Sequence, residues 1–349
     1  MIKRILSLVL IITLVFSLAS YANGLSLSAE SAVLLDAFSK DILFEKNART
    51  RMPMASTTKI MTALIVLERC KLSDTFKVDE GAVGTEGSSA YLQKGDKLTF
   101  EAALYALLLQ SANDMANALA IEIAGSTEAF AALMNEKAKE LSLSDTSFKN
   151  PSGLSAEGHY TTAYDLAMLS AVCLESEDFF RIASTKSATV KIGENDRTFV
   201  NHNKLLSLYD GACGVKTGFT KESGRCLVGA AERNGVRLIS VTLKASSDWN
   251  DHAEMLDFGF SLYREYTLFK ENELIFELPV AGEGSFITVS PKGEKSVFLQ
   301  KGKTVSAMIE APRLIFAPVK KGQIIGTLIF EADGREIFRT PLLAQSKVA

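Results

Sequence analysis

The chain has 349 residues, 47% hydrophobic and 23% charged, with a formal net charge of −3. This length can bury one large hydrophobic core or two smaller ones, and the composition excludes a globally disordered chain. With 38 basic against 41 acidic residues, the chain lacks the positive excess typical of nucleic-acid-binding proteins, so we expect no nucleic-acid partner.

The N-terminus is the most apolar part of the chain. Lys3 and Arg4 precede an uncharged run over residues 5–19, and the small residues Ser20 and Ala22 follow. A short basic region, an apolar stretch and small residues at a cleavage site are typical of a secretory signal peptide. We therefore predict a signal peptide over residues 1–22 and an extracytoplasmic chain, secreted or at the outer face of the plasma membrane. A retained membrane anchor is the alternative, because the run approaches the length that spans a bilayer.

The next part of the chain is predicted to contain a β-hairpin and several helices. Apolar and polar residues alternate from Ser31 to Glu45 around a turn at residues 39–41, which indicates the hairpin. Apolar periodicity then predicts helices over Ile60–Leu67, Phe100–Leu109 and Met115–Ala124, and a fourth that Ser126 or Thr127 caps and that runs to Leu141. The first of these is apolar almost all round, which favours a buried helix.

The following segments are predicted to be strands and one helix. The strands are Val215–Thr217, Cys226–Ala231 and Arg237–Leu243. A helix is predicted to start at Asp248 or Asn250 and to reach Tyr263.

The character of the sequence changes near residue 265. Beyond Leu268, short alternating segments are separated by Gly, Pro and Lys, which is typical of a small β-sandwich or barrel. These segments are Leu274–Leu278, Phe286–Val289, Val297–Leu299, Val305–Ile309 and Ile324–Phe330. We therefore predict an α/β domain over residues 25–265 and an all-β domain over residues 266–349.

Cysteine and histidine give no indication of metal or thiol chemistry. The cysteines are Cys70, Cys173, Cys213 and Cys226, and their spacing matches no metal site. Cys213 and Cys226 are the one pair considered for a disulfide, but buried free thiols are the prediction. The three histidines, His159, His202 and His252, lie in no catalytic or metal-binding motif, so we interpret them as surface or structural residues. We expect no cofactor and no metal.

A serine and a lysine three residues apart begin the first apolar helix. Residues i and i+3 share a helix face, so Ser56 Oγ and Lys59 Nζ can meet. A lysine in apolar surroundings is disfavoured as a cation and can accept the serine proton. The same spacing occurs on many solvated helices, so this motif alone is a weak indication.

Two further polar motifs follow. In Ser111-Ala112-Asn113, between two apolar helices, the serine can pass a proton to a leaving amine and the asparagine can hold a substrate amide. Alternatively, either residue caps the next helix. In Lys216-Thr217-Gly218, on a predicted strand, lysine and threonine can bind a carboxylate and glycine admits a substrate backbone. Alternatively, this is a solvent-facing pair before a turn.

The three motifs occur together and in the order of the signature of serine penicillin-recognising enzymes, with Ser111-x-Asn113 a variant of the second motif. The chain resembles, over nearly its whole length, the low-molecular-weight penicillin-binding proteins, serine-type D-alanyl-D-alanine carboxypeptidases of bacterial cell-wall metabolism. Further similar stretches are Pro53–Leu64, Leu109–Ala118, Asn150–Leu169 and Gly214–Gly224. The resemblance implies a penicillin-binding-protein/β-lactamase-like transpeptidase fold, α/β with an antiparallel sheet and a helical cluster, plus a small C-terminal all-β domain.

The resemblance also implies a reaction and the residues that perform it. The terminal D-alanine of peptidoglycan stem pentapeptides would be removed, and β-lactam antibiotics would acylate the same serine. The implied catalytic residues are Ser56 as nucleophile, Lys59 as its base, and Ser111. The implied substrate-binding residues are Asn113, Lys216, Thr217, Gly218 and Phe219, with the backbone N–H groups of Ser56 and Phe219 as the oxyanion hole.

The chain departs from this family in three places. Members often end in an amphipathic membrane-anchoring helix, but the last nine residues, 341–349, are too short for one, which favours release or peripheral membrane association. Some members have a histidine directly after the third motif, where this chain has Phe219. An arginine often found before the last helix of the catalytic domain is not evident in Ser246–Trp249, which leaves open the residues that assist Lys216.

Two other functions remain compatible with these motifs. A serine β-lactamase shares them, but a class A enzyme places its deacylating glutamate well before a T-T-x segment. Here Glu157 lies four residues before Thr161. A wall-fragment sensor or structural binding protein with a vestigial site is the other alternative, and the three intact motifs favour an enzyme over it.

Overall fold

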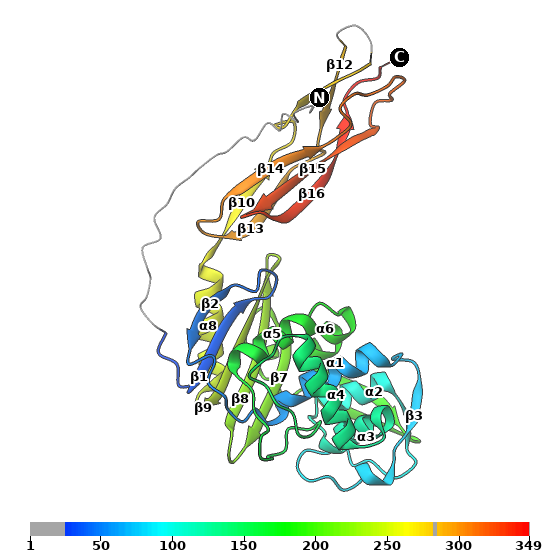
Figure 1. The fold of residues 1–349 in the computed structure, drawn as a ribbon, viewed down its shortest axis with the longest axis vertical. Coiled ribbons are helices and arrows are strands. Elements are labelled where there is room, and N and C mark those ends of the chain that lie inside the picture. Colours follow the sequence, from blue (N-terminus) through cyan, green and yellow to red (C-terminus); the bar gives the residue numbers. More distant parts are fainter. Residues whose placement is uncertain (1–24, 282–284, 349) are drawn as a thin grey trace, which may run out of the picture. The chain divides into compact units, whose positions relative to one another are not determined.

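The computed structural model describes residues 25–281 and 285–348 (Figure 1). They form two compact units, one that ends at Ser261 and one that begins at Leu262. The predicted signal peptide, residues 1–22, lies outside the described residues. Within the described residues, no helix has both the length and the hydropathy required to cross a membrane.

A five-stranded antiparallel sheet lies at the centre of the first unit, in the order β2-β1-β9-β8-β7 (Figure 1). Its strands are β1 (Ser31–Asp36), β2 (Ile42–Lys46), β7 (Ala212–Thr220), β8 (Gly224–Arg233) and β9 (Val236–Ala245). The predicted hairpin and the three predicted strands are confirmed, and each of the three extends further than predicted. Because β7 is the last strand in this order, one of its edges has no neighbouring strand. This edge lies on the side of the helical cluster.

Helices cover both faces of this sheet. They are α1 (Lys59–Arg69), α2 (Phe100–Leu108), α3 (Asn113–Ala124), α4 (Thr127–Glu140), α5 (Ala163–Cys173), α6 (Glu177–Ser184), α7 (Leu205–Leu208) and α8 (Asp248–Ser261). On one face α8 packs closely, since a Cβ at Gly259 would lie 2.6 Å from Leu238. On the other face, Val33, Leu35 and Ile239 join the core of the helical cluster.

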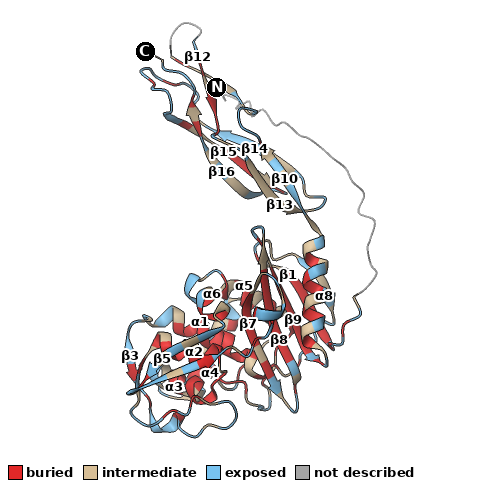
Figure 2. Cartoon of the chain, turned by 180° about the vertical axis from the view of Figure 1, so that it is seen from behind, coloured by how far each residue is buried: buried red, intermediate tan, exposed pale blue. Residues whose placement is uncertain are grey.

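The helix α1 is the centre of that cluster, and its residues from Lys59 to Val66 are all buried (Figure 2). A helix that is apolar all round must be surrounded by other elements, which confirms the predicted buried helix. It is preceded by a 3₁₀ turn, η1 (Ala55–Thr58), so the serine of the first motif lies in this turn and the lysine begins the α-helix.

The other predicted helices are also present. Gly125 ends α3 in the left-handed region (φ +81°), and Ser126 caps α4 by accepting a hydrogen bond from Ala129 N. The prediction that the last helix reaches Tyr263 is wrong, because α8 ends at Ser261 and Tyr263 begins a strand. Elements that were not predicted in this unit are α5, α6, α7, the short turn η2 (Glu80–Ala82) and two small hairpins, β3 (Thr75–Lys77) with β4 (Lys97–Thr99) and β5 (Ser187–Ile192) with β6 (Asn195–Val200).

The second unit consists of strands, as predicted. A sheet of order β11-β12-β16-β15-β14 contains β11 (Phe276–Pro279), β12 (Phe286–Ser290), β14 (Val305–Glu310), β15 (Ile324–Ala332) and β16 (Arg335–Ala344), and a second pair joins β10 (Tyr263–Phe269) to β13 (Lys295–Gln300). Residues such as Phe269, Ile287 and Leu342 form its own core. β10 and β16 were not predicted, whereas the mixed α/β unit followed by an all-β unit confirms the predicted fold class.

The four cysteines are free thiols, as predicted. In the β7–β8 pair, Cys226 lies opposite Gly218, five residues from Cys213 along β7. At about 3.3 Å per residue this separates the two cysteines by far more than a disulfide can bridge.

Candidate active site

Ser56 and Lys59 are in direct contact at the start of α1. The lysine Nζ donates a hydrogen bond of 3.0 Å to Ser56 Oγ. The i, i+3 spacing at the junction of η1 and α1 thus brings the two side chains together, as the sequence predicts. Lys59 is fully buried, whereas Ser56 is partly exposed, so a reactant can approach the hydroxyl while the lysine remains shielded from water.

The ammonium group of Lys59 has two further acceptors. Its Nζ donates to Asn113 Oδ1 at 2.6 Å and to the main-chain oxygen of Ser152 at 2.5 Å. Burial lowers the pKa of Lys59 well below its usual range, and the positive charge of Lys216 lowers it further. We expected an apolar surround, but the neighbours are polar acceptors, which orient the amine toward Ser56.

The second motif occupies the connection between α2 and α3. Ala112 is the N-cap residue of α3 and no side chain caps the helix, so the alternative of a capping Ser111 or Asn113 is wrong. Instead, Asn113 holds Lys59 with its oxygen and donates from Nδ2 to Glu86 O at 2.7 Å. Ser111 is buried and has a left-handed backbone (φ +61°), a conformation that costs energy for a residue with a Cβ and that is frequent at functional sites.

A buried carboxylate that the sequence analysis did not single out holds the loop beside Asn113. Asp114 accepts hydrogen bonds from Ser89 Oγ at 2.6 Å, Ala90 N at 2.9 Å and Leu92 N at 3.1 Å. From the other side, Arg197 of β6 donates to the main-chain oxygens of Ala90 and Tyr91. The loop at residues 86–92 therefore has a fixed position next to Lys59 and its partner Asn113.

The segment 150–154 contributes a main-chain hydrogen-bond acceptor to the site. Thr62 Oγ1 donates to Pro151 O at 2.7 Å, and Asn150 Oδ1 accepts from Gly153 N at 2.7 Å. These contacts direct the Ser152 oxygen toward Lys59. The sequence motifs do not indicate this acceptor, because a main-chain carbonyl has no side-chain signature; the Asn-Pro-Ser-Gly turn sequence is the signal that could have indicated it.

Replacing Gly153 by alanine should destabilise the first unit and slow its chemistry. A Cβ at Gly153 would lie 1.9 Å from Ala55 O, and the backbone there is left-handed (φ +87°), so the turn that carries Ser56 must move. We expect about 2–3 kcal/mol loss of unfolding free energy beyond the cost of the left-handed alanine, measured by urea denaturation. Gly235→Ala is the matched control, because that glycine also has a positive φ (+77°) but open space around it. Equal losses in the two variants would contradict the close contact.

His159 lies next to η1, the turn that carries Ser56, and both of its ring nitrogens are hydrogen-bonded. Lys149 N donates to its Nδ1 at 3.0 Å and its Nε2 is 2.8 Å from Thr58 Oγ1, which in turn donates to Ala55 O at 2.8 Å. Since Nδ1 accepts, the ring proton is on Nε2. Burial lowers the pKa of His159 to about 4, so the ring is neutral near pH 7 and supports the serine turn, in keeping with a structural histidine.

The other two histidines are outside the hydrogen bonds that join Ser56, Lys59 and Asn113. His202 nevertheless lies near the third motif, since burial and the positive charge of Lys216 lower its pKa. His252 is fully buried between Ser240 Oγ (2.7 Å) and Thr242 Oγ1 (2.9 Å). The main-chain N–H of His202 donates to Leu109 O. No group of three or more His, Cys, Asp or Glu side chains among the described residues is arranged to hold a metal ion.

The third motif lies on the edge strand β7, directly against the serine turn. A Cβ at Gly218 would be 3.0 Å from Ser56 N and 3.1 Å from Met54 O, so a side chain there would push the strand away. The Lys216 side chain is buried, and its Nζ donates to Thr217 O at 3.0 Å; the alternative of a solvent-facing Lys-Thr pair is therefore wrong for the lysine. Phe219 is 66% exposed.

Burial lowers the pKa of Lys216 to about 7. The electrostatic effect of Lys216 on Lys59 shows that the two amines belong to one site. Two lysines whose cationic forms are disfavoured, one of them touching a serine hydroxyl, form an arrangement suited to activating a nucleophile and receiving an anion.

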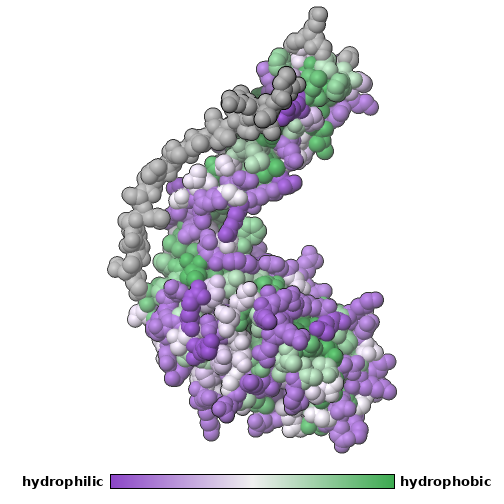
Figure 3. All heavy atoms as spheres, in the orientation of Figure 1, coloured by the Kyte–Doolittle hydropathy of each residue, from purple (hydrophilic) through white to green (hydrophobic). Residues whose placement is uncertain are grey.

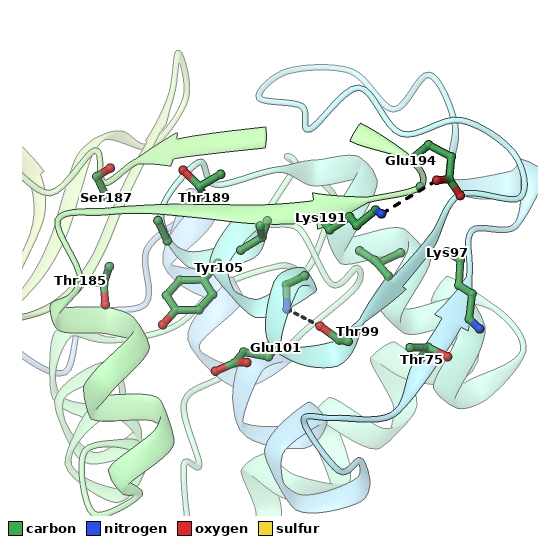
Figure 4. Close-up of a pocket in the computed structure, with 15 residues that line it drawn as sticks. Thr75, Lys97, Thr99, Glu101, Tyr105, Thr185, Ser187, Thr189, Lys191 and Glu194 are labelled. Carbon is green, nitrogen blue, oxygen red and sulfur yellow. Dashed lines mark hydrogen bonds and ion pairs between the residues drawn. The ribbon is translucent and has the colours of Figure 1, made fainter. Parts of the chain in front are cut away.

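A separate cavity of about 800 Å³ lies between α2, β4 and β5 (Figure 4). Its walls include Tyr105, Glu101, Thr99 and Thr189, and none of the three motifs contributes to it. Because none of the three motifs lines this cavity, the candidate active site is the cluster around Ser56.

The chain is similar to known proteins along both units. A model of the family D-alanyl-D-alanine carboxypeptidase matches residues 18–247, and a model of the penicillin-binding protein 5 C-terminal domain matches residues 263–349. D-alanyl-D-alanine carboxypeptidase DacF of Bacillus subtilis is 36% identical over 98% of this chain and 94% of its own length, and DacC of Escherichia coli is 33% identical over 93% and 85%.

Solved structures give the same result for the fold. The crystal structure of the D-alanyl-D-alanine carboxypeptidase DacD from Francisella tularensis has a TM-score of 0.66 and 30% identity, covering 93% of this chain and 95% of that one. Penicillin-binding protein 5 from Haemophilus influenzae has a TM-score of 0.66 and 27% identity, covering 93% and 98%.

Proposed function

The chain belongs to the D-alanyl-D-alanine carboxypeptidase family and is a serine-type carboxypeptidase, and we propose that it removes the terminal D-alanine of peptidoglycan stem pentapeptides through an acyl-enzyme on Ser56. We propose further that β-lactams acylate the same serine. The observation that carries the proposal is the 3.0 Å contact between Ser56 Oγ and a fully buried lysine whose pKa is depressed.

In the first step, neutral Lys59 removes the proton of Ser56 Oγ while this oxygen attacks the penultimate carbonyl carbon of the peptide. The carbonyl oxygen becomes an anion, which the backbone N–H groups of Ser56 and Phe219 stabilise. Such preorganised donors contribute several kcal/mol in known enzymes. The position of Gly218 against Ser56 N supports this assignment, because it brings the β7 backbone next to the serine amide.

In the second step the C–N bond breaks and the proton on Lys59 passes, with the help of Ser111, to the leaving D-alanine amine. The acyl group remains on Ser56 as an ester, and water then hydrolyses this ester. Asn113 orients Lys59 and binds a substrate amide. Lys216 and Thr217 bind the terminal carboxylate of the substrate, whose negative charge raises the pKa of the buried Lys216 and keeps it protonated.

All three motifs lie in the first unit, and we assign catalysis to this unit, which ends at Ser261, and a supporting, non-catalytic role to the β domain that begins at Leu262. Peptidoglycan lies outside the plasma membrane, so this function requires an extracytoplasmic enzyme. The proposed function is also consistent with the predicted signal peptide and with a peripheral association of the enzyme with the membrane.

The activity is tested by measuring D-alanine release from a defined pentapeptide. The proposal predicts turnover with this substrate and slow release of a chromogenic cephalosporin after acylation. Sustained fast cephalosporin hydrolysis without D-alanine release would identify a β-lactamase, and peptide binding without any release would identify a sensor. Either result would refute the carboxypeptidase proposal.

The pH dependence of kcat/KM should be bell-shaped. On the acid side the rate rises as Lys59 loses its proton and becomes a base. On the alkaline side the rate falls as Lys216, with a pKa of about 7 in the empty enzyme, loses the charge that binds the carboxylate. Because kcat/KM reports the free enzyme, the falling limb should have its midpoint near this value.

The Lys216→Arg variant tests whether Lys216 controls the falling limb of the pH profile of kcat/KM. An arginine stays charged throughout this range, so the falling limb should move to higher pH while the rising limb stays in place, whatever the loss in maximal rate. A falling limb at the same pH in the wild type and in Lys216→Arg would show that another group controls it.

A further inference from the structure

The outer face of the second unit carries apolar side chains where a sheet normally carries polar ones. The strand β11 pairs with β12 such that Pro279 lies opposite Phe286. On the other side of β11, Val280 pairs with Ile315 in a parallel bridge. The strands β12 and β11 and the segment around Ile315, which joins β11 through a single bridge, therefore lie side by side.

The inner face of this surface is buried, and part of its outer face is apolar as well. On the inner face, Ile287, Val280 and Ile315 are buried in the core of the unit. Because successive residues of a strand point to opposite faces, their neighbours point outward. Those neighbours are Pro279, Phe286, Leu314 and Phe316, which we call the outer patch; Phe286 is 61%, Leu314 44% and Phe316 72% exposed.

Such a patch is unusual on a sheet with one solvated face, where apolar-in and polar-out residues alternate. Single exposed apolar residues need no explanation, but a contiguous group indicates a binding surface. In the space-filling view, hydrophobic residues gather at this end of the second unit (Figure 3).

The segment that contributes Leu314 and Phe316 to the outer patch is basic, and β11 adds one exposed carboxylate, Glu277, on the face that carries Pro279. Residues 311–330 contain no Asp or Glu, but they contain Arg313, Lys320 and Lys321, all of which are exposed. Ile324, in the same segment, is 65% exposed. Exposed aromatic and aliphatic side chains with lysine and arginine beside them are the combination that binds the interface of an anionic bilayer: the rings enter the acyl boundary and the cations bind the headgroups.

We propose that the outer patch and the basic segment beside it form a docking surface for an anionic lipid bilayer. A second copy of the chain is a poorer occupant, because self-association would bring three cations against three. A folded protein partner usually offers pockets for aromatic anchors, whereas a bilayer requires only exposed rings such as Phe286 and Phe316 beside cations.

The proposal is tested with a local fluorescent probe. The chain contains one tryptophan, Trp249, in the first unit, so Phe316→Trp adds a reporter in the outer patch. With vesicles of phosphatidylglycerol and phosphatidylcholine in equal parts, we expect a blue shift of its emission and quenching by brominated acyl chains. The matched control is Phe38→Trp, which replaces a phenylalanine that is 75% exposed in the turn between β1 and β2 and should not respond.

The charge contribution is measured in the same background. Adding Lys320→Ser and Lys321→Ser to Phe316→Trp should weaken vesicle affinity about fivefold per cation removed, whereas Lys186→Ser with Lys204→Ser, two exposed lysines of the first unit, should leave it unchanged. Vesicles of phosphatidylcholine alone should bind more weakly.

Three results would overturn the proposal. One is an unchanged Phe316→Trp emission with anionic vesicles; because the tryptophan reports its own surroundings, contact through another part of the chain cannot mask this result. Another is an equal response of Phe38→Trp. The third is self-association without lipid that Phe316→Ser abolishes, which would make a second copy the occupant. D-alanine release from a soluble pentapeptide should be the same in Phe316→Ser and the wild type, so failure of this proposal is distinct from failure of the proposed catalytic function.

Discussion

Replacing Ser56 by alanine is expected to lower D-alanine release about 10⁴-fold or more, since removing the nucleophile of a serine enzyme eliminates the covalent route. Lys59 loses one hydrogen-bond acceptor but keeps Asn113 Oδ1 and Ser152 O, so the fold should persist. The measurement is single-turnover and steady-state release from a pentapeptide, with circular dichroism to show that the variant is folded.

The control for this substitution is Ser207→Ala, which removes an exposed hydroxyl in α7 and should not change the rate. Ser111→Ala distinguishes the two serines of the site. It should slow proton transfer to the leaving group, by about 10²–10⁴-fold, but it should still permit an ester on Ser56. Normal release by Ser56→Ala together with loss of every covalent intermediate in Ser111→Ala would assign the nucleophile to Ser111 instead.

Replacing Lys59 by arginine is expected to reduce the acylation rate about 10³-fold, within the range for loss of a general base. Arginine retains a cation and several donors for Asn113 and Ser152, but it cannot be deprotonated in this environment. Lys221→Arg, a substitution of an exposed lysine, is the control. Stopped-flow acylation by a chromogenic β-lactam measures the effect.

The pH series separates a base from a purely structural lysine. If Lys59 acts as the base, raising the pH cannot restore the rate of the arginine variant, and its rising limb disappears. If Lys59 only positions Ser56, the variant should lose rate uniformly and keep the rising limb of the wild type.

The central features of the site were predictable because they are local in sequence. Ser56 and Lys59 lie one helical turn apart, so their contact follows from helix geometry alone. Buried α1 was also predictable, because residues 60–66 are nearly all apolar. The three strands from β7 to β9 follow one another with short turns, and their order in the sheet follows from that connectivity.

The parts that were not predicted depend on contacts distant in sequence or on main-chain atoms. The third acceptor of Lys59 is the carbonyl of Ser152, 93 residues away. Asp114 binds amides of a loop more than twenty residues before it, and nothing in the sequence identifies those amides. The boundary between α8 and β10 was misplaced because Leu262 and Tyr263 fit an apolar helical face as well as a strand, and pairing with Gln300 decides the outcome.

The strand β16 illustrates a different limit. Its ten residues include Arg335, Glu336, Arg339 and Pro341, and charged residues with a proline argue against a strand inside a sheet. Pairing with both β15 and β12 overrides this local preference. Register with neighbours, which the sequence does not show, therefore determined the element.

Intact-protein mass spectrometry after exposure to penicillin tests the acyl-enzyme most directly. We expect one covalent adduct per chain with the mass of the intact antibiotic, because ring opening adds the whole molecule to the serine ester. Proteolytic mapping should locate it on the peptide that contains Ser56, and Ser56→Ala should remain unmodified under the same conditions. An unmodified wild-type chain, or an adduct that persists in Ser56→Ala, would contradict the assignment of Ser56 as the nucleophile.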